Sequence, residues 1–252
     1  MFEINKKKYL SLISITVFIC SYLLFVELVL PVSEIIPKPS LIFESMISLF
    51  KDYGIVQSLA LTSSVVYINL FLGYLLIHLF GALILKLNDN IGFIAVFSFL
   101  KLFKYFPFFA GIILFVFFYN TSINGEFIFS FLFVIVSLLN NFSCYDKDYV
   151  NKYKNFINNN KISSNKFYKV KYKLVQPGLY NLFNKLHLTL WAAVIMYEFI
   201  ALTGGLGTKY YLLLSNHDFS GFVSLAILIG FLIWIGNSIS VVIKNKIIFW
   251  EQ

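Results

Sequence analysis

Long apolar segments constrain the fold of this chain more than any other feature. A helix of about twenty apolar residues is long enough to cross the hydrocarbon core of a bilayer. We expect such spans at 10–30, 59–87, 91–119, 127–140, 186–202 and 221–243. Residues 108–119 are either a span of their own or the second half of one that starts earlier.

The composition agrees with a membrane location. Of the 252 residues, 59% are hydrophobic and only 13% are charged, which is too little charge to cover a water-soluble domain of this size. The sequence therefore predicts an all-α, polytopic membrane protein, with about six transmembrane helices in a single domain, 1–252.

The lysines predict the orientation of these spans. All 20 basic residues are lysines, and the chain has no arginine. If both termini are cytoplasmic, only Lys38, Lys51 and Lys209 fall on the outer side. Because cytoplasmic loops carry the excess of basic residues, the pattern favours this topology. The net charge of +8 then reflects topology and anionic lipid, and no nucleic-acid binding is expected.

A short surface helix is expected after the first span. The prolines of Pro31–Pro39 prevent the first helix from continuing. Ser40 is then expected to cap a helix over Ser40–Asp52, which carries an apolar stripe at helical spacing. This segment is either an amphipathic helix at the outer surface or a plain connector.

The longest polar segment is the loop expected at 141–185, which carries nine of the lysines. Within it, Lys166–Val175 alternates lysines with aromatic and aliphatic residues, so a helix here has an aromatic–aliphatic face and a basic face. Pro177–Gly178 is expected to end this short helix, at about Ser164–Val175, before the chain re-enters the membrane. Such a helix fits a groove on a soluble partner or a surface of anionic lipid.

The segment Leu174–Gly207, LVQPGLYNLFNKLHLTLWAAVIMYEFIALTGGLG, resembles the signature half of binding-protein-dependent ABC-transporter permeases. The similarity is greatest to the nitrate/sulfonate/taurine-type import family. The matching features are Gln176–Pro177 for the family's Leu-Pro, Lys185–Leu186–His187 for its Gly-Leu-Arg, Trp191, Glu198, and Gly205–Leu206–Gly207. Ile35–Met46 and Lys104–Phe118 resemble upstream parts of the family, so the resemblance covers most of the chain.

This resemblance implies the membrane subunit of an ATP-driven importer in a bacterial inner (plasma) membrane. The implied partners are an ABC ATPase subunit, an extracytoplasmic solute-binding protein, a second permease copy and the lipid bilayer. The implied ATPase-coupling residues are Asn158, Asn159, Asn160, Lys161, Ser164, Phe167, Tyr168, Tyr172, Lys173 and Pro177. Asn158–Asn160 and Ser164 stand where the family has Glu-Ala-Ala and Gly.

The resemblance also places Trp191, Glu198, Gly205 and Gly207 on the translocation path or at its gate. The implied solute is a small anion (nitrate, sulfonate, taurine or bicarbonate) or a thiamine-precursor-like compound. Judged from its residue type, Glu198 is expected to face protein or water, because a charge at the bilayer centre costs about 2.5–3.5 kcal/mol. It lies either in the cavity or near the outer interface, bonded to a neighbouring helix.

Chemistry within the chain itself is not expected. No Walker lysine motif, nucleophile–base pair or metal-ligand spacing is present in the sequence, so the chain is predicted to be non-catalytic and to hold no cofactor. Gly204–Gly207 is expected to form a sharp turn and not a phosphate loop. The alternative function is that of a polytopic membrane protein without transport activity, such as an assembly factor or a membrane enzyme.

Overall fold

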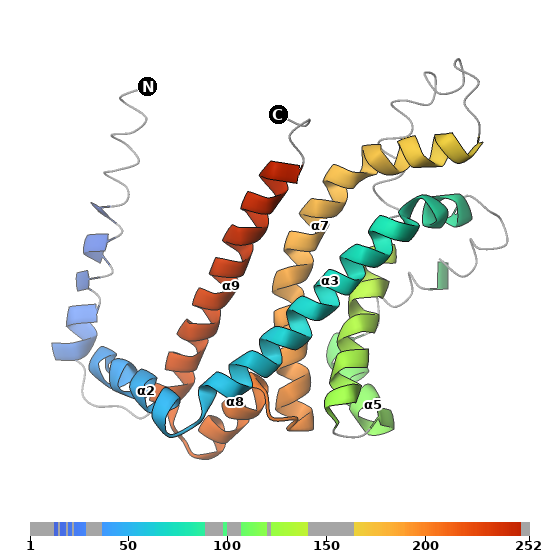
Figure 1. Cartoon of the computed structure of the whole chain (residues 1–252). Coiled ribbons are helices and arrows are strands. Elements are labelled where there is room, and N and C mark those ends of the chain that lie inside the picture. Colours follow the sequence, from blue (N-terminus) through green and yellow to red (C-terminus); the bar gives the residue numbers. More distant parts are fainter. Residues whose placement is uncertain are drawn as a thin grey trace. The chain divides into compact units, whose positions relative to one another are not determined.

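The computed structural model is helical throughout its regular structure in the residues that it describes. These are residues 13–14, 16–18, 20–21, 23–28, 37–88, 98–99, 107–119, 122–140 and 164–247. The helices include α2 (Pro39–Lys51), α3 (Ile55–Asn88), α5 (Phe108–Tyr119), the helix Ile123–Asn140, α7 (Ser164–Ala201), α8 (Leu206–Ser215) and α9 (Phe219–Ile247) (Figure 1). The all-α prediction is confirmed for this part of the chain.

Three of these helices are long and apolar enough to cross a membrane. They are Ile55–Leu87, Ile123–Asn140 and Phe219–Val242. Gly178–Ala201 and Leu206–Ser215 make a fourth if the two, bent by 54°, form one span. Their bounds agree with four of the predicted spans to within a few residues, apart from the start of α7. The predicted spans at 10–30 and 91–119 lie partly outside the described residues.

Helix α7 differs from its prediction. It runs without interruption from Ser164 to Ala201, so Pro177–Gly178 does not end it, and residues 164–185 are helix and not loop. A proline removes one backbone hydrogen bond and bends a helix, and the yellow start of α7 runs at an angle to its orange remainder (Figure 1). Val175 and Leu179, on either side of the proline, are both buried. Burial of both parts of α7 therefore outweighs the lost bond.

Contacts divide the chain into two compact units. The first comprises Met1–Ile55 and Tyr210–Ile229, and the second comprises Val56–Lys209 and Gly230–Gln252. In the first unit, two hydrogen bonds donated by serine hydroxyls join α2 to the start of α9. Ser45 Oγ donates to Ser220 Oγ at 2.7 Å, and Ser224 Oγ donates to the Ile42 carbonyl at 2.6 Å.

A helix, α2, is present over the segment where one is predicted, but its cap differs from the predicted cap. It begins at Pro39, with Lys38 as the N-cap residue, because proline is well suited to the first helical position. Ser40 therefore lies inside the helix. Its backbone N–H and its hydroxyl donate to the Glu27 carboxylate at 3.2 and 2.8 Å.

The second unit has an aromatic core shared by three helices. Its members are Ile112 of α5, Phe129 of the helix Ile123–Asn140, and Ala193, Tyr197 and Ala201 of α7. The Tyr197 ring stacks on Phe129 with 5.3 Å between ring centroids. This packing fixes the second half of α7 against both neighbouring helices.

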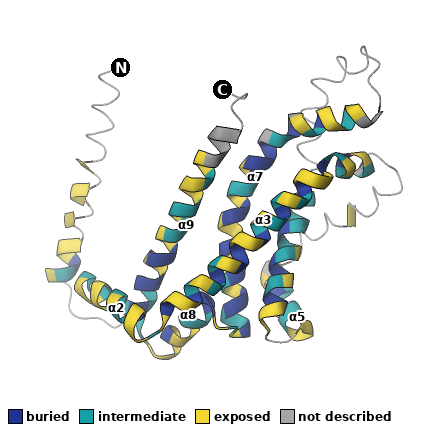
Figure 2. Ribbon diagram, viewed as in Figure 1, coloured by how far each residue is buried: buried dark blue, intermediate teal, exposed yellow. Residues whose placement is uncertain are grey.

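Two glycines of α3 allow close approach of other helices in this unit. A Cβ atom at Gly73 would lie 2.5 Å from Val134 Cγ1, and one at Gly81 would overlap the Tyr172 ring. Elsewhere α3 exposes large apolar side chains such as Phe71 and Leu79, and Figure 2 shows exposed stretches, in yellow, along this helix. Exposed apolar surface on a helix of membrane length is the surface that lipid covers.

Candidate functional site

Helix α7 carries polar or aromatic residues at three levels, and α3 contributes residues to each level. The first level is the tyrosine pocket, lined by Tyr74, Ile77, Tyr172, Gln176, Leu179, Tyr180 and Phe183. The second is the His187–Trp191 pair, with Tyr67. The third is the carboxyl cluster, which consists of Glu126, Glu198, Thr62, Thr203 and Gly207.

The implied ATPase-coupling residues are only partly within the described structure. Asn158, Asn159, Asn160 and Lys161 lie outside the described residues. The remaining six all belong to α7: Ser164, Phe167, Tyr168, Tyr172, Lys173 and Pro177. Lys173 is exposed, whereas Phe167, Tyr168 and Tyr172 are half-buried.

At the start of α7, one lysine does not lie on the predicted basic face. Lys171 is buried, and its Nζ lies 5.9 Å from the centre of the Phe167 ring and 5.6 Å from that of Tyr168. Helical spacing explains this position, since residues four apart share a face. Val170 is exposed instead. The basic face therefore consists of the exposed Lys166, Lys169 and Lys173.

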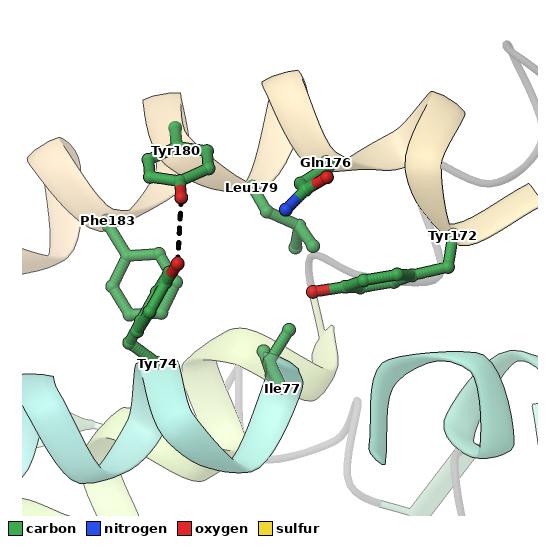
Figure 3. Close-up of a pocket in the computed structure, with 7 residues that line it drawn as sticks. All are labelled: Tyr74, Ile77, Tyr172, Gln176, Leu179, Tyr180 and Phe183. Atoms are coloured by element: carbon green, nitrogen blue, oxygen red, sulfur yellow. Dashed lines mark hydrogen bonds between the residues drawn. The ribbon is translucent and has the colours of Figure 1, made fainter. Parts of the chain in front are cut away.

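The tyrosine pocket joins the start of α7 to α3. The Tyr74 and Tyr180 hydroxyls lie 2.9 Å apart, and the Tyr172 hydroxyl and the Gln176 amide point into the space beside them (Figure 3). Burial, with a smaller contribution from Tyr74, raises the pKa of Tyr172 to about 12. Tyr172 therefore stays a neutral phenol at physiological pH, able to donate a hydrogen bond.

The His187–Trp191 pair lies in the middle of α7. The fully buried Trp191 donates its indole N–H to His187 Nε2 at 3.1 Å. Because indole nitrogen is only a donor, this bond assigns the imidazole proton to Nδ1. The Tyr67 hydroxyl lies 3.4 Å from the same Nε2 atom. Any side chain at Gly236 of α9 would overlap Tyr67 and His187.

The carboxyl cluster is centred on Glu198, which is fully buried. The Thr62 hydroxyl of α3 lies 2.6 Å from Glu198 Oε1, and the Gly207 N–H donates to Glu198 Oε2 at 2.8 Å. The Leu206 N–H donates to Thr62 Oγ1 at 2.9 Å. Glu198 thus connects α3, α7 and the first turn of α8, and it is bonded to a neighbouring helix.

The glycines after α7 have separate roles in this cluster. Gly204 has φ +100°, which favours glycine, and its carbonyl accepts a bond from Ser58 Oγ at 2.9 Å. Gly205 and Gly207 have a different role, since a Cβ atom at Gly205 would overlap the Glu198 carboxylate and one at Gly207 would overlap the Ile195 carbonyl. The predicted sharp turn is confirmed by the 54° bend between the two helices.

A second buried carboxyl, Glu126, belongs to the same cluster. It lies near the start of the helix Ile123–Asn140 and is fully buried. Thr203 donates to its Oε2 atom at 2.7 Å. Its Oε1 atom and the buried Tyr197 hydroxyl have no hydrogen-bond partner within the described residues. Glu126 is close enough to Glu198 and to Tyr197 to interact electrostatically with both.

Sequence reasoning missed most partners of the implied path residues. Glu126, Thr62, Thr203 and Tyr197 were not among the expected site residues, and neither was the role of His187 beside Trp191. An acidic residue at the edge of an apolar run was the one available signal for Glu126. The threonines and the tyrosine carry no such signal, because the contacts arise from which helices pack together.

The comparisons with known proteins do not identify a family. No protein-family model matches the chain, and no curated protein or solved structure is significantly similar to it. The class therefore rests on the fold. The described helices define an all-α membrane protein with three helices long and apolar enough to cross a membrane, or four with the bent pair.

Proposed function

We propose that this chain is the membrane-spanning permease subunit of an ATP-binding-cassette importer. The observation that carries the proposal is the continuity of α7. This helix begins at Ser164, and its first turns carry exposed lysines and half-buried aromatic residues. It ends near Ala201, at the carboxyl cluster. A force applied to its start would therefore act on the whole helix. An importer needs such a connection between an ATPase and the solute path.

The contacts of α7 support this role. The Tyr172 ring lies against Gly81 of α3, and the Glu198 carboxyl bonds to Thr62 of α3. The two helices are thus joined near both ends. In the proposed mechanism, a partner ATPase docks at the start of α7, and closure of the ATPase tilts α7 and α3 together. The solute path then opens alternately to the two sides of the membrane.

The proposal includes six spans, with both termini in the cytoplasm. The helix α5 has 12 residues and extends about 18 Å, which is short of a hydrocarbon core of about 30 Å. A membrane span in this part of the chain therefore needs residues before Pro107 as well. The span expected at 91–119 includes them. The first span is the one expected at 10–30. Positive-inside counting supports this arrangement, since only three lysines fall outside.

The proposed assembly contains two permease copies, ATPase subunits and an extracytoplasmic solute-binding protein. The solute class follows the resemblance alone: a small anion or a thiamine-precursor-like compound. The chain itself would not hydrolyse ATP. Among the described residues, no group of three or more His, Cys, Asp or Glu side chains is placed to hold a metal ion.

Co-purification tests this function. The tagged full-length chain is extracted from its native membrane in mild detergent, and ATPase activity and protein composition of the eluate are measured. We expect an ATPase with a Walker motif to co-elute. The double variant Lys169→Glu/Lys173→Glu reverses two exposed charges at the start of α7 and should reduce the co-eluting ATPase at least several-fold.

The matched control is Lys51→Glu, an exposed lysine of α2 predicted to lie on the outer side. It should retain the ATPase at the wild-type level. If the wild-type chain brings down no ATPase, the importer proposal is wrong, and a membrane protein without transport activity becomes the better interpretation. If both variants lose the ATPase equally, α7 is not the docking site.

A further inference from the structure

We propose that Glu198 is a proton-binding site within the membrane helices, holding one proton that bonds to Thr62 and joins α3, α7 and α8. This inference does not depend on transport or on an ATPase partner. It follows from the number of hydrogens available to the buried hydroxyl of Thr62 and from a second buried carboxyl beside Glu198.

The first argument counts hydrogens at Thr62. A hydroxyl has one hydrogen to donate and two lone pairs to accept with. The Leu206 N–H occupies one lone pair at 2.9 Å. Two oxygens lie at hydrogen-bond distance from the same hydroxyl: Glu198 Oε1 at 2.6 Å and the Ser58 carbonyl at 3.0 Å. One hydrogen cannot serve two acceptors with full bonds.

A proton on Glu198 Oε1 satisfies all three contacts. The carboxylic acid then donates to the remaining lone pair of Thr62 Oγ1, and Thr62 donates to the Ser58 carbonyl, a usual bond for threonine in a helix. The other oxygen, Oε2, still accepts from the Gly207 N–H at 2.8 Å. The distance of 2.6 Å is typical of a strong O–H···O bond.

The second argument comes from the neighbouring carboxyl. Glu126 is also fully buried, and neither its Oε1 atom nor the buried Tyr197 hydroxyl beside it has a hydrogen-bond partner among the residues that the structure describes. Two ionised carboxylates close enough to interact electrostatically in a buried site repel each other, and one proton removes that repulsion. The contacts of Glu198 from α3 and α8, Thr62 and Gly207, are uncharged.

Within the described part of the chain, the titratable groups that face Glu198 or its partner are Glu126, from the helix Ile123–Asn140, and Tyr197, from α7 itself. No cation of this described part acts on either carboxyl. The proton comes from the aqueous solvent and returns there. Its loss leaves Thr62 with one hydrogen for two acceptors and places a second negative charge beside Glu126, which weakens the corner between α7 and α8.

Infrared spectroscopy of the purified chain in lipid nanodiscs tests the proposal. The carbonyl stretch of a carboxylic acid is distinct from the bands of a carboxylate. We expect one such band at neutral pH in the wild type. It should be absent in Glu198→Gln and present in Glu126→Gln. No protonated carboxyl band in the wild type at neutral pH would overturn the proposal. Loss of the band in Glu126→Gln but not in Glu198→Gln would also overturn it.

Thermal unfolding in the same nanodiscs gives a second readout. The amide of Glu198→Gln can donate to Thr62 and accept from Gly207, so this variant mimics the protonated acid. We expect it to match the wild type at neutral pH and to exceed it in midpoint temperature at alkaline pH, where the wild type loses its proton. If the midpoint temperatures of the wild type and Glu198→Gln changed with pH in parallel, the proposal would be contradicted. If Glu198→Gln fails to fold, the band in Glu126→Gln decides the matter: its presence there supports Glu198 as the protonated carboxyl, and its loss there overturns the proposal.

Discussion

The Glu198 carboxylate occupies the space that a side chain at Gly205 would need. Both residues are buried, and the Gly207 N–H bonds to Glu198 Oε2 at 2.8 Å. The turn after α7 therefore packs directly against an acidic side chain. Glycine is required at position 205 because a side chain there would overlap the Glu198 carboxylate, and not because of its backbone angles. Four predictions follow from contacts of this kind.

Replacement of Gly205 by alanine should destabilise the chain. The added methyl group would overlap the Glu198 carboxylate, and overpacking of a buried site costs about 1–3 kcal/mol. Denaturant unfolding in detergent micelles measures the change. The matched control is Gly230→Ala in α9, where a Cβ atom would meet nothing within 4 Å. Alanine there should leave the stability unchanged or raise it by about 1 kcal/mol. Equal effects at the two positions would contradict the predicted overlap.

Thr62→Val should separate α3 from the turn that begins α8. Valine keeps the shape of threonine but removes the hydroxyl, which leaves the Leu206 N–H and Glu198 Oε1 without that partner. An unsatisfied buried polar group costs about 1–3 kcal/mol. The comparison variant Thr62→Ser retains the hydroxyl and should keep most of the stability. Equal unfolding midpoints for Thr62→Val and Thr62→Ser would show that this hydroxyl does not contribute to the stability of the chain.

Gly81→Ala should disturb the start of α7, because the new methyl group would overlap the Tyr172 ring. The second variant, Tyr172→Ser, removes that ring. In the double variant the overlap is absent, so the cost of Gly81→Ala should be smaller than in the wild-type background. Residues in contact show such coupling at about 0.5–3 kcal/mol in double-mutant cycles. Additive unfolding free energies would mean that Tyr172 does not lie on Gly81 in the membrane.

The Tyr172 phenol should also lose its proton at a higher pH than an ordinary tyrosine. Burial raises its pKa from 10.0 to about 12, so the folded chain holds this phenolic proton at a pH where the unfolded chain has lost it. The corresponding contribution to stability is fully present below pH about 10 and is lost as the pH rises toward about 12. Ultraviolet absorbance of tyrosinate should show one fewer late-titrating group in Tyr172→Phe. A titration curve identical to that of the wild type would refute this assignment.

Several features were predictable from the sequence because their causes are local. The apolar length of a segment decides whether it can cross a bilayer, so the three described helices of membrane length and the bent pair were found from hydrophobicity alone. The helix α2 followed from prolines before an apolar stripe. The turn at Gly204 followed from a glycine-rich run at the end of a span. Glu198 was singled out as a charged residue in an apolar segment, whereas Trp191 was named from the family resemblance alone.

The tertiary structure decided the features that depend on a partner helix. Pro177 is a helix-ending signal by itself, yet burial on both sides of it keeps α7 continuous. Lys171 lies on the aromatic face because of its register. Glu126 and Glu198 are 72 positions apart in the chain, and no local pattern indicates that they share one cluster. The sequence thus determined which described helices are long and apolar enough to cross a membrane, since apolar length is a property of each segment. Only packing decided which side chains meet, since that depends on two segments at once.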